Sequence, residues 1–243
     1  MSRRGSWQGA LQILRFNWPM YMFAIGVIIF CIAIWQIPGW PRFFAAAVSA
    51  PTLYFTFASL IASHWIYDLS PLVDWRWLPG WLPQPIGRWM LIQAGFDSTY
   101  GFLRAQMPAP PAVVMDLYGM PGAGGASVRR AHRGVSAADT VAALPAEPAS
   151  VDTVLAVFAL HEIHTPAGRA DFFCALARTL TANGRLMVVE HLRDWKNFLV
   201  FGGGFLHFKS EREWQRCAAA ASLRLEKQLS ITPFVRVFLW RKS

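Results

Sequence analysis

The chain has 243 residues, and 54% of them are apolar, which exceeds the roughly 45–50% usual for soluble globular proteins. Its net charge of +9 comes from scattered Arg and Lys residues rather than from blocks of like charge, so the composition does not indicate a nucleic-acid-binding protein. The cysteines form no CxxC pair, which argues against a disulfide scaffold. Because the apolar excess lies in the first hundred residues, the expected partner is a membrane with anionic lipids.

Two uncharged segments near the N-terminus have the length of membrane-spanning helices. The first covers residues 18–37, and the second covers residues 43–67 with Pro51 inside it. Each provides the roughly 20 residues that a helix needs to cross the hydrocarbon core, and membrane helices tolerate an internal proline. Only GWPR joins them, so we predict an antiparallel transmembrane hairpin over residues 1–67.

Positive charges flank this hairpin unequally. Arg3, Arg4 and Arg15 precede the first span, whereas Arg42 alone lies in the turn. The positive-inside rule therefore predicts a multi-pass protein of the inner (cytoplasmic) membrane, with its N-terminus and its C-terminal domain in the cytoplasm. A cleaved signal peptide ending near AAAVSA is the alternative, but the first apolar run is longer than the apolar region of a signal peptide.

The following segment, residues 68–107, begins with tryptophans interleaved with prolines. This composition suits the headgroup region of a bilayer, and we predict an interfacial linker here. The alternative is an irregular cap packed on the C-terminal domain.

The remaining chain alternates short apolar runs with helical patterns, which is typical of an α/β domain with a mostly parallel sheet. We place this domain at residues 108–243. The predicted strands are 112–117 as the first strand, 151–160, 184–191, and a closing pair at 223–229 and 234–240. The predicted helices are 126–133, 167–180 and 211–221.

The segments VDTVLAVFALHEI and ANGRLMVVEHLRD, followed by a terminal hairpin, resemble the class I S-adenosylmethionine-dependent methyltransferases over roughly residues 113–241. Within that superfamily the chain looks most like the group of the quinone C-methyltransferases. The sequence from EHLRDWKNF to the C-terminus is similar to that of uncharacterised, membrane-anchored bacterial members of the superfamily. The resemblance implies a Rossmann-like domain with a C-terminal β-hairpin, S-adenosylmethionine as cofactor, and a hydrophobic acceptor such as a quinone or lipid precursor.

The resemblance also places the cofactor loop in MDLYGMPGAGG, residues 115–125. The implied cofactor-binding residues are Asp116, Gly119, Gly122, Gly124 and, near the adenine, Asp139. Tyr118 stands where the family has its first glycine. Only 26 residues separate Gly125 from Asp152, too few for the usual strands and helix. Part of the usual sheet is therefore expected to be missing or compressed, and no ribose-binding acid is identifiable.

Two polar motifs follow consecutive strands, HEIH at residues 161–164 and EHLRD at residues 190–194. Because parallel strands end at one edge of the sheet, we expect His161, Glu190 and His191 to lie together as candidate catalytic groups. The alternative for each histidine is a hydrogen bond to loop backbone. HEIH is not the H-E-x-x-H of zinc peptidases, and no metal ligand is predicted, although a facial triad of two histidines and a carboxylate stays an alternative.

The aromatic and glycine-rich segment 195–208 follows these motifs. It is either an apolar lid that turns Asn197 or His207 inward, or a segment that covers the sheet or touches the bilayer.

The sequence thus predicts a membrane-anchored methyltransferase, and leaves its oligomeric state open. The alternative is a catalytically silent methyltransferase-like domain that serves as a membrane-bound interaction module, favoured by the altered loop and by TANG, residues 181–184, where the family commonly has Pro-Gly-Gly. A nicotinamide-dependent reductase is disfavoured, because the chain has no G-x-G-x-x-G loop followed by an acid at the right spacing.

Overall fold

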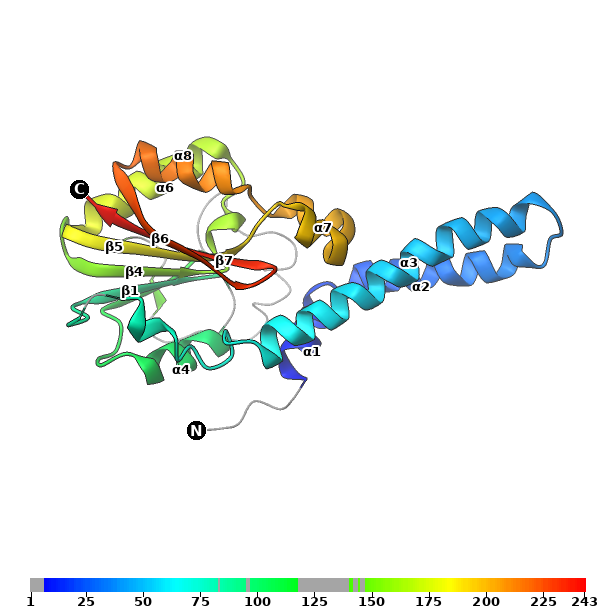
Figure 1. Ribbon diagram of the computed structural model, residues 1–243, viewed down its shortest axis with the longest axis horizontal. Helices are drawn as coiled ribbons and strands as arrows, with labels where there is room; N and C mark the ends of the chain where they lie inside the picture. The colour runs from blue at the N-terminus through cyan, green and yellow to red at the C-terminus, as the bar shows by residue number, and fades with distance from the viewer. Residues whose placement is uncertain (1–6, 83, 95–96, 118–139, 142–143, 145–146) are drawn as a thin grey trace.

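The structure is a computed structural model that describes residues 7–82, 84–94, 97–117, 140–141, 144 and 147–243. A layered α/β domain holds the C-terminal part of the chain. A pair of long antiparallel helices, α2 and α3, projects away from this domain (Figure 1). The predicted helix 126–133 lies outside the described residues.

The projecting pair confirms both helices that the sequence predicted. Helix α2 runs over Trp18–Trp35 and α3 over Trp40–His64, with Pro51 accommodated inside α3. The chain reverses at Gly39, whose φ of 92° lies in the left-handed region that favours glycine. Between the two helices, the hydroxyls of Tyr21 and Ser59 lie 3.2 Å apart and share a hydrogen bond.

A short helix that the sequence did not predict, α1 (Gln8–Phe16), precedes the pair and packs beside the π-helical turn η1 (Trp65–Leu69). The Asp68 carboxylate accepts hydrogen bonds from the backbone N–H groups of Gly9 and Ala10, at 2.6 and 3.0 Å. A carboxylate at this end of a helix satisfies N–H groups that have no partner within the helix. Asp68 therefore fixes α1 against the base of the hairpin.

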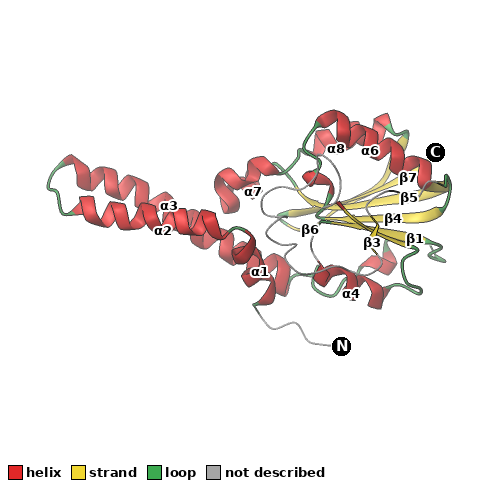
Figure 2. Cartoon of the chain, turned by 180° about the vertical axis from the view of Figure 1, so that it is seen from behind, coloured by secondary structure: helices red, strands yellow, loops and turns green. Residues whose placement is uncertain are grey.

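The domain is built on a seven-stranded sheet with the order β3-β2-β1-β4-β5-β7-β6. The bounds of its strands are β1 Trp89–Gln93, β2 Val113–Asp116, β3 Thr140–Val141, β4 Val151–Val157, β5 Leu180–His191, β6 Leu223–Thr232 and β7 Val235–Lys242. The first five strands in this spatial order are parallel, whereas β7 is antiparallel to both β5 and β6. The closing antiparallel hairpin was predicted from the sequence and is confirmed (Figure 2).

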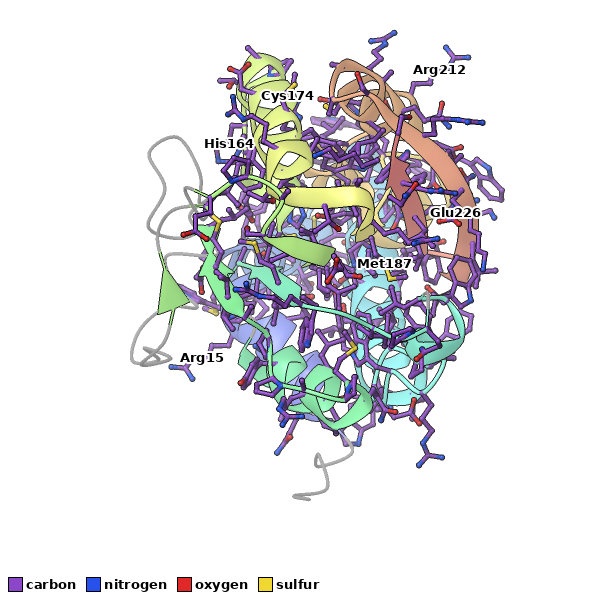
Figure 3. All side chains as sticks on the ribbon, turned by 90° about the vertical axis from the view of Figure 1, so that its left-hand side faces the viewer. Arg15, His164, Cys174, Met187, Arg212 and Glu226 are labelled. Carbon is purple, nitrogen blue, oxygen red and sulfur yellow. The ribbon has the colours of Figure 1, made fainter. Side chains whose placement is uncertain are left out.

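Two hydrophobic cores lie on opposite faces of this sheet, because successive strand residues point to opposite sides. On one face, helices α6 (Pro166–Thr179) and α8 (Glu211–Ala220) bury Phe173 and Trp214 against the strands. Figure 3 labels Cys174 on α6 and Met187 on the central strand β5. Met187 points into the core of the other face, which α4 (Asp97–Gln106) covers.

Local sequence explains where the covering helices begin. Pro166 occupies the first turn of α6, and the side chain of Thr165 accepts a hydrogen bond from Gly168 N–H. Helix α8 starts at Ser210, whose hydroxyl accepts from Glu213 N–H in an S-x-x-E capping pattern. The predicted helices 167–180 and 211–221 and the predicted strands at 151–160 and 184–191 are therefore confirmed.

The sequence assigned the first strand to the wrong segment. Residues 112–117 form β2, and the first strand is β1, at the centre of the sheet between β2 and β4. The sheet also contains β3, which has only two described residues, so this part of the sheet is short rather than missing. Strand β1 is short and follows a Trp- and Pro-rich run, which is why it escaped a search based on periodicity.

Residues 68–107, expected as an interfacial linker, instead belong largely to the domain. Besides β1 and α4 they contain the turn η2 (Leu78–Gly80), and side chains such as Leu72, Trp75 and Leu82 are buried in the core beneath the sheet. The residues of this range before β1 are therefore the packed cap that the sequence left as the alternative, whereas β1 and α4 are elements of the α/β domain itself. The α/β domain begins before residue 108.

Candidate active site

The parallel strands end at a common edge, which is where ligands bind in open α/β sheets. The strand order reverses between β1 and β4, so the crevice is expected beside the last residues of these strands. Gln93 ends β1, and Asp116 ends β2 opposite it in the register of the two strands. Two polar side chains from neighbouring strands thus meet at the position that a nucleotide cofactor would occupy.

Gln93 is 2% exposed, and its Oε1 atom has no hydrogen-bond partner among the described residues. Leaving a buried acceptor without a partner costs about 1–3 kcal/mol, so such an atom usually marks a site that a ligand or water completes. Asp116 is also buried, at 8% exposure. Both side chains are therefore buried at the carboxyl ends of neighbouring strands.

The predicted cofactor residues are only partly placed. Gly119, Gly122, Gly124 and Asp139 lie outside the described residues. Asp116 is placed, but it ends the second strand rather than opening the loop after the first. It follows Gly95 by about 20 residues, the spacing at which an acid reaches the ribose of a nucleotide. Asp116 is therefore the candidate for the acid that the sequence analysis could not identify.

The predicted catalytic residues His161 and Glu190 do lie together. Glu190 ends β5, is fully buried, and places its Oε2 atom 2.7 Å from Nδ1 of His161 in the turn η4 (Leu160–Glu162). Its Oε1 atom accepts from the backbone N–H groups of Ala159 and Leu160, at 3.0 and 2.9 Å, and from that of His161 at 3.4 Å. Glu190 therefore holds both the backbone of this turn and the ring of His161.

His161 also has a second carboxylate beside it. Its Nε2 atom lies 3.5 Å from Oε1 of Glu162, and the ring is 8% exposed. Burial opposes protonation of the ring, but the charges of Glu190 and Glu162 outweigh it and raise the pKa of His161 to about 10. His161 is thus a cation at neutral pH, suited to orienting a negative oxygen atom and not to accepting a proton.

His191 has a different environment, although it is adjacent in the sequence to Glu190. Its Nδ1–H donates to the carbonyl of Phe234 at 3.0 Å, and its Nε2 accepts from the hydroxyl of Tyr67 at 2.8 Å. Burial lowers the pKa of His191 to about 4, so the ring is neutral. Both nitrogen atoms are engaged, and His191 therefore has the backbone-binding role that the sequence analysis gave as the alternative.

The aromatic segment after β5 forms α7 (Trp195–Phe201) and the turn η5 (Gly202–His207). Asn197 is fully buried and donates to Asp194 and to the Phe234 carbonyl, so it supports the loop. His207 turns inward, and its Nε2 atom lies 3.2 Å from Oε1 of Glu162. One of the two residues predicted to face the site does so.

The same segment connects the site with the projecting helices. The ring of Phe198 in α7 lies 5.9 Å from that of Phe55 in α3, measured between centroids. A Cβ atom on Gly202 would meet the Phe55 ring at 3.2 Å, so glycine permits this close approach. Trp195, Leu199 and Leu206 are exposed beside it, which leaves an apolar surface between the site and the base of the hairpin.

Two helical stretches, Trp18–Trp35 and Trp40–Leu69, are long and apolar enough to cross a membrane. Only 11% of the apolar window in each is buried within the structure, and side chains such as Phe23, Ile29 and Phe43 are 62–79% exposed. A core helix of a water-soluble protein would be buried instead. The apolar side chains of both helices are therefore largely exposed in the described structure.

No protein-family model matches this sequence, and no curated protein sequence matches it either. Solved structures are similar at the level of the fold. A SAM-dependent methyltransferase from Aquifex aeolicus is 15% identical, with a TM-score of 0.51 over 71% of this chain and 91% of that protein. Human N-acetylserotonin methyltransferase, solved in complex with SAM, is 14% identical, with a TM-score of 0.54 over 96% of this chain and 70% of that protein. The chain has the fold of the SAM-dependent class I methyltransferases.

Sequence reasoning missed two residues of this region. Gln93 was hidden because β1 was not recognised, although the run WMLIQ, bounded by glycines at 87 and 95, is the available signal. Tyr67 was assigned to the second span, and nothing in its sequence context indicates a partner in β5.

Proposed function

We propose that this chain is an S-adenosylmethionine-dependent methyltransferase, anchored in a membrane by α2 and α3, that acts on a hydrophobic acceptor such as a quinone or lipid precursor. The observation that carries the proposal is the combination of the fold with Asp116 at the end of β2. A sheet of this order with an acid at that point provides what a nucleoside cofactor needs for its ribose.

The described residues fit the cofactor. Asp116 offers carboxylate oxygens to ribose hydroxyls, and Gln93 offers an acceptor atom that no described residue satisfies. The bound cofactor would supply an electrophilic methyl group. The chain itself contributes the binding, the orientation of the acceptor and the exclusion of water.

His161 and Glu162 would orient the acceptor, since they follow β4 on the far side of the switch point from Asp116. The positive charge of His161 favours an acceptor whose oxygen carries negative charge, such as a phenolate or an enolate. Glu190 keeps the ring in place without contacting the acceptor, because it is fully buried.

The anchor explains how a hydrophobic acceptor would reach this site. Exposed apolar side chains of α7 and η5 lie next to α3, so an acceptor dissolved in the bilayer would meet apolar side chains between the bilayer and the domain. The Arg residues that precede the first span favour a cytoplasmic position for the domain, where the methyl donor is available.

The test uses the full chain, purified in detergent and reconstituted into vesicles made from a total lipid extract of bacterial membranes. After incubation with methyl-labelled S-adenosylmethionine, label is expected in the organic-solvent extract, and Asp116→Asn is expected to reduce it at least tenfold. The matched control is Asp74→Asn, because Asp74 is exposed and lies in the cap, away from the crevice.

Absence of label in the extract, from a chain shown to bind the cofactor, would contradict a lipid-like acceptor. Absence of cofactor binding would contradict methyl transfer altogether and would favour the silent interaction module. Recovery of the chain as a water-soluble oligomer after removal of detergent would contradict the membrane anchor, because a second copy would then cover the hairpin.

A further inference from the structure

Three side chains with metal-binding atoms gather beside β4, outside the position of the cofactor. They are His161 and Glu162, both in η4, and His207, at the end of η5. One ligand atom from each lies within 4.8 Å of the others. The three residues come from segments 45 positions apart, so the fold and not the local sequence brings them together.

The spacing matches what a small divalent ion requires. Nε2 of His161 and Nε2 of His207 lie 3.5 and 3.2 Å from the same oxygen, Oε1 of Glu162. Ligands placed about 2.1 Å from a tetrahedral ion are separated by about 3.4 Å. Two of the three distances between ligand atoms are therefore already near this value. Only the distance between the two imidazoles has to adjust.

Glu190 orients the ring of His161 for metal binding. Its Oε2 atom accepts the Nδ1–H of His161 at 2.7 Å, which directs the other ring nitrogen toward Glu162 and His207. A carboxylate that holds the far nitrogen of a metal-binding histidine fixes the ring and its tautomer and strengthens it as a ligand. Three backbone N–H groups fix Glu190 in turn. The arrangement thus orients His161 as a ligand, and binding of an ion would displace the proton that Nε2 of the cationic ring carries.

The site is also accessible from one side. The side chain of His207 is 38% exposed, whereas those of His161 and Glu162 are 10% and 3% exposed. An ion could therefore enter past His207, and at least one coordination position would stay open for an oxygen atom. A closed structural site would need a fourth protein ligand.

We propose that His161, Glu162 and His207 bind a divalent first-row transition ion, with Zn²⁺ as the ion that two imidazoles and one carboxylate suit best. This site does not depend on the proposed methyl transfer, because the ion binds to the chain without cofactor or acceptor. If both proposals hold, the ion would replace the proton of His161 as the positive charge, and the open position is where an acceptor oxygen would bind.

The experiment uses the full chain without an affinity tag, purified in detergent, stripped with chelator and dialysed against micromolar Zn²⁺. Metal content is measured by mass spectrometry, and the visible absorption of the Co²⁺-substituted chain reports the ligands. We expect about one ion per chain, and at least a tenfold weaker affinity in His207→Ala and in Glu162→Gln. Two variants are used so that a folding defect in one, monitored by circular dichroism, does not decide the result.

The matched control is His164→Ala. His164 is an exposed histidine two positions beyond Glu162, and it is not part of the three-residue cluster. It is expected to keep full binding. Binding of less than about 0.1 ion per chain in the unmodified protein, or an equal loss of binding in His164→Ala, would overturn the site.

Discussion

The hydrogen bond between Tyr67 and His191 joins the base of the hairpin to the central sheet, and Tyr67→Phe tests it. The substitution removes one oxygen atom and leaves Nε2 of His191 without the hydroxyl that lies 2.8 Å away. His191 is 3% exposed, so water cannot easily replace the donor. When a buried acceptor loses its donor, the free energy of unfolding decreases by about 1–3 kcal/mol.

This cost should be visible as a lower melting temperature. For a chain of this size, 1 kcal/mol corresponds to roughly 2–4 °C, so a loss of about 2 kcal/mol predicts a decrease of about 4–8 °C. The assay is thermal unfolding of the detergent-purified chain at pH 7.5, followed by circular dichroism. The comparison variant is Tyr54→Phe, which makes the same chemical change on an exposed side chain of α3. Equal melting temperatures for the two variants would refute the reasoning.

Three other predictions concern the same fold. Because the pKa of His191 is about 4 in the folded chain and 6.5 in the unfolded chain, the unfolded state binds more protons at His191 between these values. The contribution of His191 to stability is therefore fully present above pH 6.5 and falls by about 3 kcal/mol as the pH drops to 4. A melting temperature that does not depend on pH over this range would contradict this prediction. Gly9→Ala should lower stability by about 1–3 kcal/mol, because its new Cβ atom would collide with the Cβ atom of Tyr67. Gly26→Ala should not lower stability, because Gly26 has open space around it. Equal melting curves for the two variants would refute the close packing of α1. Phe173→Ala should lower the free energy of unfolding by about 3–5 kcal/mol, because this 1% exposed ring stacks with Trp214 in the core. A decrease below about 1 kcal/mol in denaturant unfolding would show that the core is not packed as described.

Sequence patterns identified the second half of the domain because its elements are long and regular. Strand β5 contains an Asn-Gly pair near its start, α6 and α8 begin with capping residues, and the last two strands surround a short turn. In these segments local propensity and tertiary packing agree, and agreement of this kind is what makes a segment predictable.

The first half of the domain was mispredicted for a physical reason. Strand β1 has only five residues, all buried, so it has neither alternation nor length to distinguish it from the Trp-rich run before it. Once β1 was missed, β2 became the first strand, and Asp116 was assigned to a glycine loop instead of the position of a ribose acid. One missed strand thus changed the position in the fold that was assigned to Asp116.

Only part of the candidate site could be predicted from the sequence. His161 and Glu190 follow neighbouring strands, so topology alone brings them to one edge. The contact of His207 with Glu162 depends on the path of α7 and η5, which no local pattern specifies. The opposite protonation states of His161 and His191 depend on burial and on Glu190, and these appear only in three dimensions.

The central claim, that the crevice at β1 and β2 binds S-adenosylmethionine, is tested most directly by calorimetry. The detergent-purified chain is titrated with S-adenosylmethionine and S-adenosylhomocysteine, beside Asp116→Asn and the exposed control Asp74→Asn. Our account predicts micromolar binding that Asp116→Asn weakens at least tenfold and that Asp74→Asn leaves unchanged. No heat of binding at millimolar ligand, in a chain that melts cooperatively, would contradict the account.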